Sequence, residues 1–131
     1  MAVSALTNVS TRPKAGKFSA TLTAAATPAA SAIYIGFTPN HIILQQIAGS
    51  PDATWRSEWH KGMTDAYSVL DSNASAGTIP TTNGFTILTG NEVVATATAA
   101  ATGSPATAGQ GFVVGTGVIA ANIVYNLTAY L

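Results

Sequence analysis

The sequence predicts an all-β protein: an antiparallel, jelly-roll-like β-sandwich of about eight short strands, with an extended N-terminal arm. Three observations predict this class: short runs of alternating or apolar residues, Gly, Pro, Asn and Ser turns between these runs, and no sustained helical period. Without helices to cover a sheet, such strands bury their apolar sides by packing sheet on sheet. A length of 131 residues allows one domain. We expect an arm over residues 1–16 and a single β-sandwich domain over 17–131.

The first half of the domain contains three predicted strands. From Lys17 onward, apolar and hydroxyl side chains alternate, which is the period of a half-buried strand. The Ala-rich segment 24–32 has helical propensity, but Pro28 interrupts it, so we expect a loop or a strand edge there. Two apolar runs that end in Gly, Pro and Asn turns predict the next strands, 33–35 and 41–47.

Residues 54–63 fit two interpretations. In a helix, Trp55 and Trp59 would stack at a spacing of four residues. In a strand, one face would carry the charged and imidazole side chains of Arg56, Glu58 and His60. The segment is short and lies between a proline and a glycine, which favours the strand.

The second half contains further strand signals. The Asn83–Gly84 dipeptide is typical of a hairpin turn and precedes an apolar run. The last ten residues alternate between apolar and mostly polar side chains. We expect strands over 66–70, 85–88, 92–98, 112–114 and 122–131.

The composition favours a protein that assembles. Charged residues make up 8% of the chain, against about 25% in an ordinary soluble domain, while hydrophobic residues make up 47%. A chain with so little charge does little to keep copies apart. Five basic residues balance five acidic ones, so the positive field of a nucleic-acid-binding protein is missing. The uncharged residues 93–131 are interrupted by Gly, Pro, Asn and Gln, so we expect neither a membrane span nor a membrane partner.

The sequence offers little for catalysis. The chain has no cysteine, which excludes a thiolate nucleophile and a thiolate-ligated zinc or iron site. His60 lies near Glu58 and Asp65, but we interpret this group as an exposed charge cluster. His41 follows a turn at a strand start, and the chain contains no nucleophile elbow, P-loop or zinc-protease motif. We therefore expect no enzyme, no catalytic residues, no cofactor and no metal.

Two groups of residues are candidates for contacts with a partner protein or with other copies of the chain. The first is basic and lies before any acidic residue: Arg12, Lys14 and Lys17. We expect it to dock on an acidic surface as an extended arm. The second is aromatic: Trp55, Trp59 and Tyr67. These rings suit core or intra-oligomer packing, an external interface anchor, or a sugar-stacking platform.

Several short motifs follow one another along the chain: Ile33-x-Ile35-Gly36-Phe37-Thr38-Pro39-x-x-Ile42, Trp55-x-x-Glu58-Trp59-x-x-Gly62-Met63, Thr82-Asn83-Gly84-Phe85, Gly111-Phe112-Val113-Val114-Gly115-Thr116 and Asn122, before an aromatic-rich final strand. Their order resembles a family of small tailed-bacteriophage virion proteins, the head decoration or cement proteins. The resemblance covers residues 33–130.

This resemblance implies a virion structural protein on the capsid exterior that stabilises contacts between major capsid subunits. Its partners would be the major capsid protein and further copies of itself, in a homo-oligomer that we expect to be a trimer. It would be made in the cytoplasm of the bacterial host and would bring no catalytic residues. Two alternatives stay open: a tail, neck or head-fibre base component, and a carbohydrate-binding or adhesin-like β-sandwich.

Overall fold

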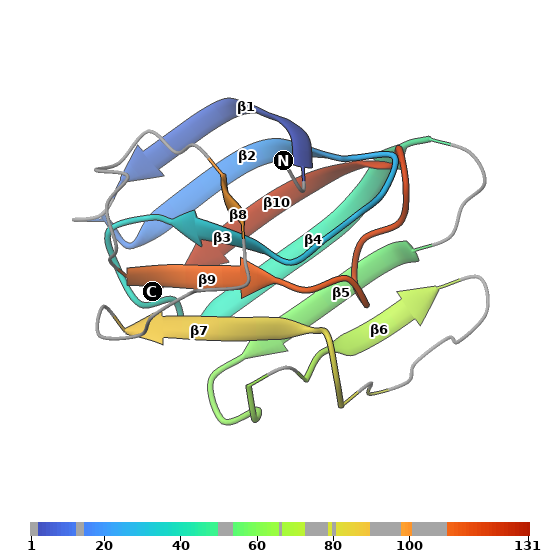
Figure 1. Ribbon diagram of the computed structural model, residues 1–131. Coiled ribbons are helices and arrows are strands. Elements are labelled where there is room, and N and C mark those ends of the chain that lie inside the picture. Colours follow the sequence, from blue (N-terminus) through green and yellow to red (C-terminus); the bar gives the residue numbers. More distant parts are fainter. Residues whose placement is uncertain are drawn as a thin grey trace.

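The computed structural model describes residues 3–12, 15–49, 54–65, 67–72, 79, 81–89, 98–100 and 110–131. Within these residues the chain is all-β, as predicted, and forms ten strands (Figure 1). They are β1 (Val3–Arg12), β2 (Lys17–Ala24), β3 (Ser31–Tyr34), β4 (His41–Ala48), β5 (Thr54–His60), β6 (Val69–Ser72), β7 (Phe85–Thr89), β8 (Thr98–Ala100), β9 (Gln110–Val114) and β10 (Val124–Tyr130). The strand predicted over 92–98 lies outside the described residues except for Thr98.

The strands form two sheets. One has six antiparallel strands in the order β1-β2-β10-β4-β5-β6. In the other, β7, β9 and β3 pair antiparallel, and β8 joins the free side of β3 in parallel. The two sheets lie one over the other in Figure 1. The chain therefore adopts the predicted two-sheet, predominantly antiparallel class.

One hydrophobic core contains residues of both sheets. In the six-stranded sheet, alternate residues of β2 and β10 are buried, as period two predicts. From the other sheet come Phe85 and Phe112, whose rings meet edge to face with centroids 6.4 Å apart. The largest fully buried side chains are Tyr125, Phe18, Phe85, Phe112, Leu22, Ile33, Ile35, Ile42, Leu44, Ile123 and Leu127. Burying each large apolar side chain contributes about 1.5–3 kcal/mol, so this core stabilises the fold.

Two hydrogen bonds connect the segment between β5 and β6 to the second sheet. The backbone N–H of Phe85 donates to the carbonyl of Tyr67 at 3.3 Å. The N–H of Ile87 donates to the carboxylate Oδ1 of Asp65 at 3.2 Å. Asp65 therefore holds β7 against the six-stranded sheet.

The N-terminal segment belongs to the sheet. The sequence predicts an extended arm over residues 1–16, separate from the domain; in the structure, residues 3–12 are extended but pair with β2. A register shift lies between Thr7 and Ser10, where Asn8 has a φ of 51°. This bulge turns both Leu6 and Val9 against the core. Their spacing of three residues hides the period of two, which is why the sequence pattern did not predict a strand here.

Two glycines at close backbone crossings explain part of the glycine content near the C-terminus. A Cβ on Gly111 would overlap the carbonyl oxygen of Ile33 on the neighbouring strand β3. A Cβ on Gly115 would overlap the carbonyl of Asn83, and the Gly115 N–H donates to the carbonyl of Gly84 at 2.9 Å. Both glycines therefore have structural roles in a strand and in a turn, as their sequence context predicts.

Candidate functional site

The face of the six-stranded sheet opposite the core carries a row of five side chains. Register partners on antiparallel strands point to the same side of a sheet. Arg12 pairs with Lys17, Lys17 with Tyr130, Tyr130 with His41, and His41 with His60. Their chain neighbours Phe18, Ile42, Trp59 and Ala129 are buried on the other face. We call these five residues the end row.

At the basic end of this row, no acidic side chain of the described residues forms an ion pair. Arg12 and Lys17 are both exposed and stand directly opposite each other. The ion pairs among the described residues are those of Glu58 with His41 and with Arg56, so neither Arg12 nor Lys17 belongs to one. Like charges directly opposite each other on a sheet repel, so this pair leaves a positive potential open to a partner.

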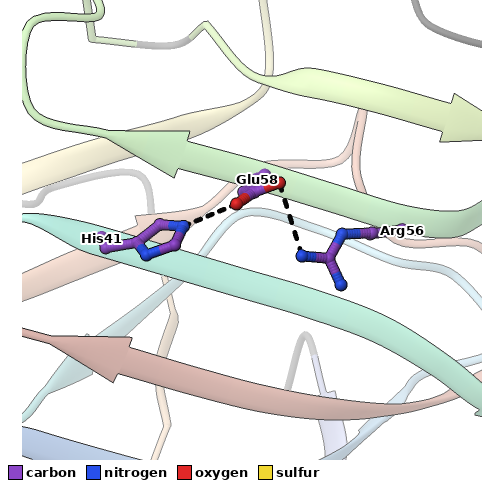
Figure 2. Close-up of polar contacts among 3 residues, drawn as sticks. All are labelled: His41, Arg56 and Glu58. Atoms are coloured by element: carbon purple, nitrogen blue, oxygen red, sulfur yellow. Dashed lines mark hydrogen bonds and ion pairs between the residues drawn. The ribbon is translucent and has the colours of Figure 1, made fainter.

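Beside the row, Glu58 contacts two basic side chains on the same face (Figure 2). Its Oε1 lies 2.6 Å from Nε2 of His41, and its Oε2 lies 3.5 Å from Nη2 of Arg56. The hydrogen bond to His41, together with the Arg56 charge, holds the pKa of the Glu58 carboxyl below its ordinary value, although partial burial raises it. Glu58 is therefore an ionised, doubly paired carboxylate at neutral pH.

His41 lies in the middle of a small aromatic group. Its ring centroid is 6.3 Å from that of His60 in an edge-on arrangement and 6.2 Å from that of Tyr130 in a tilted one. Tyr130 is 37% exposed. The rings of Tyr130, His41 and His60 therefore lie side by side on the solvent face of β10, β4 and β5.

The structure separates the predicted contact residues. It brings Arg12 and Lys17 together, whereas Lys14 lies outside the described residues. Trp59 is 5% exposed, and its Nε1 donates to the carbonyl of Thr64 at 3.4 Å. Trp59 therefore packs in the core of its own chain and leaves no ring face for a partner or for a sugar.

The two other aromatic candidates belong to neighbouring segments of the chain. Trp55 is part of β5, and Tyr67 is half-buried beside the start of β7. A sugar-stacking platform that includes Trp59 is excluded by the burial of that ring. An interface role for Trp55 or Tyr67 stays a prediction.

The sequence pattern missed the partner of Glu58. Local spacing associates Glu58 with His60 and Asp65, but its imidazole partner is His41, 17 residues away. Asp65 instead bonds the β7 backbone. The signal that could have found the pair is the register of β4 and β5, in which His41 is opposite His60 and Glu58 is opposite Ile43. A hairpin register depends on the length of its connection, which local patterns do not give.

Neither a metal site nor a membrane-spanning helix is found in the described part of the chain. In that part, no three His, Asp or Glu side chains are grouped in a way that could hold a metal ion. Nor does that part include a helix with the length and apolar character needed to cross a membrane.

In comparisons with protein-family models, with curated proteins and with solved structures, no match to this chain is found. The resemblance of the motif order to phage decoration proteins therefore stays a prediction, and the function rests on the chemistry of the surface.

Proposed function

We propose that this chain is a non-enzymatic virion structural protein, a decoration or cement protein that binds the outside of a bacteriophage head and stabilises contacts between major capsid subunits. Its partners are then the major capsid protein and further copies of itself, as a trimer. Two lines of support meet here: the order of the sequence motifs and the low charge of the chain. In this proposal the two sheets are the layers of a jelly-roll-like sandwich.

The observation that carries the proposal is the pairing of Arg12 with Lys17. Two exposed cations at adjacent positions of β1 and β2, outside the ion pairs of the described residues, repel each other in the isolated chain. An acidic partner surface would relieve this repulsion and gain two charge-assisted contacts. Because both residues are held on a sheet, docking costs less conformational entropy than docking of a free arm.

The test uses heads that lack this protein. Purified chain is mixed with such heads, and bound protein is measured after sedimentation. We expect saturable binding that falls by about tenfold or more in the charge-reversed variant R12E/K17E, because attraction becomes repulsion. Unchanged binding of this variant would discard the role of the pair.

Charge reversal is a cleaner change than removal of residues 1–16. Deletion would remove β1, and with it Leu6 and Val9, from the core. Loss of binding after deletion would then report loss of the fold. The variant R12Q/K17Q serves as an intermediate step, because it removes the charges without introducing repulsion. Its binding should lie between the wild type and R12E/K17E.

A further inference from the structure

The end row also contains three rings that the proposed docking of Arg12 and Lys17 does not use. Tyr130, His41 and His60 continue the row across β10, β4 and β5. Adjacent strands are about 4.8 Å apart, so a row across five strands is about 19 Å long. The chain neighbours of its members point into the core, so the next side chains on this face lie two residues away, about 6.6 Å along each strand.

The charge of this row changes along its length. Arg12 and Lys17 are cationic at one end, and the imidazole rings of His41 and His60 lie opposite each other at the other end. The groups that face His41 are Glu58 and His60 on β5 and Tyr130 on β10. The groups next to His60 are His41 and the exposed Lys61.

Glu58 is the carboxylate beside the imidazole end of the row. Both of its carboxylate oxygens are engaged, one by His41 and the other by Arg56. The carboxylate of Asp65 points away to the backbone of Ile87. The described part of the row is therefore cationic at one end and carries imidazole rings, one of them bonded to Glu58, at the other.

We propose that the end row binds an extended acidic segment of a partner protein, laid across the strands with its carboxylates over Arg12, Lys17, His41 and His60 and packed on the Tyr130 ring. Alternate side chains of an extended chain repeat about every 6.6 Å, so three or four acidic side chains fit a row about 19 Å long. This inference rests on the proposed docking function and names the chemistry of the partner.

A peptide fits this row better than a nucleic acid does. The row is narrow, and the same sheet face carries Glu58 and Asp71, which repel a second line of phosphates. The chain as a whole has no net charge. An extended peptide with one line of acidic side chains contacts only the residues of the row.

The test measures binding of a labelled peptide of alternating Glu and Thr to the full chain by fluorescence anisotropy. We expect K17Q to weaken binding by about fivefold or more, since it removes a cation from the row. The matched control is D71N, which removes one exposed charge from the same face outside the row without freeing a carboxylate beside it. It should change the affinity by less than about twofold, because exposed charges beyond about 8 Å are screened at physiological salt. A gain of affinity in D71N as large as the loss in K17Q would show general electrostatics and overturn the proposal.

The variant H60A tests the histidine half of the row. We expect it to weaken binding by about threefold or more, because it removes an imidazole N–H that can donate to a carboxylate of the peptide. Unchanged affinity in H60A would overturn the part assigned to His41 and His60. Thermal melts of each variant, followed by circular dichroism, identify a misfolded protein before its binding is interpreted.

The outcomes also separate this inference from the proposed function. If heads bind the chain but the peptide does not, the inference fails and the proposed function stands. If the peptide binds in the expected pattern while the protein is missing from particles, the row stands and the function fails. Binding of a single-stranded oligonucleotide as tightly as the peptide, with the same loss in K17Q, would assign the row to nucleic acid and overturn the inference.

Discussion

Nε2 of His41 lies 2.6 Å from Oε1 of Glu58, which joins the first residue of β4 to the centre of β5 on the outer face of the six-stranded sheet. The contact is diagonal, because the register partner of His41 is His60. Diagonal pairs on antiparallel strands are within reach of long side chains. This pair therefore fixes the position of the His41 imidazole, between Tyr130 and His60 in the end row.

The first prediction concerns the acid stability of this pair. The pKa of Glu58 is lowered from its ordinary value of 4.5 in the folded chain. A group of this kind contributes stability that is present above the ordinary pKa and lost as the pH falls through the lowered one. In thermal melts, we expect E58Q to be less stable than the wild type at about pH 6 and to lose less stability than the wild type as the pH falls below about 4.

The control for that experiment is K61Q, which changes an exposed charge outside the described ion pairs. It should follow the wild-type curve. If E58Q and the wild type lost stability in parallel below about pH 4, the ionised Glu58 would not contribute to folding.

The second prediction concerns Trp59. Since the ring is buried among core residues, W59A should destabilise the fold by about 3–5 kcal/mol in urea unfolding, and W59F by less. An interface anchor would instead leave the stability of the isolated chain nearly unchanged and weaken assembly. A loss below about 1 kcal/mol for W59A would contradict the core assignment.

The third prediction concerns the close crossing of β3 and β9. A Cβ at Gly111 has no room beside the carbonyl of Ile33, so G111A should cost about 3 kcal/mol or prevent folding. Urea unfolding measures the loss. The substitution S19A, at a half-buried position on the outer face of β2, serves as the comparison and should stay within about 0.5 kcal/mol of the wild type. Equal effects of the two changes would mean that the strands do not approach this closely.

The fourth prediction concerns the bulge in β1. Asn8 has a φ of 51°, and its Nδ2 donates to Oγ1 of Thr21 at 3.2 Å. We expect N8V to destabilise the fold by about 1–2 kcal/mol, because a β-branched residue is strained in this conformation. N8G should cost less, since glycine adopts positive φ freely. If N8V were as stable as N8G, β1 would not be held in the sheet in this register.

Local sequence patterns predicted the strands whose side chains alternate cleanly. The strands β2 and β10 follow that pattern and lie where the alternation places them, and β4 lies where its apolar run predicts a strand. The first strand was missed because the bulge at Asn8 breaks its period. The predicted strand 66–70 begins at Val69 instead, because Tyr67 turns back to bond Thr64 and Phe85.

The candidate site was predicted less completely than the fold. The basic residues were found from their segregation in the sequence, but their assembly with Tyr130 and the two histidines depends on the pairing of five strands. Strand order and register are set by contacts between distant segments. For the same reason, the sequence left the core and interface interpretations of Trp59 open, and only the packing of the two sheets decided between them.

The proposed function is tested most directly by the number of copies of this protein per particle. Its ratio to the major shell protein is measured by quantitative mass spectrometry of purified particles from its source. A decoration protein repeats with the shell, so we predict a ratio within about threefold of one. A few dozen copies or fewer would move the protein to the vertex, neck or tail, and its absence from particles would contradict a virion role altogether.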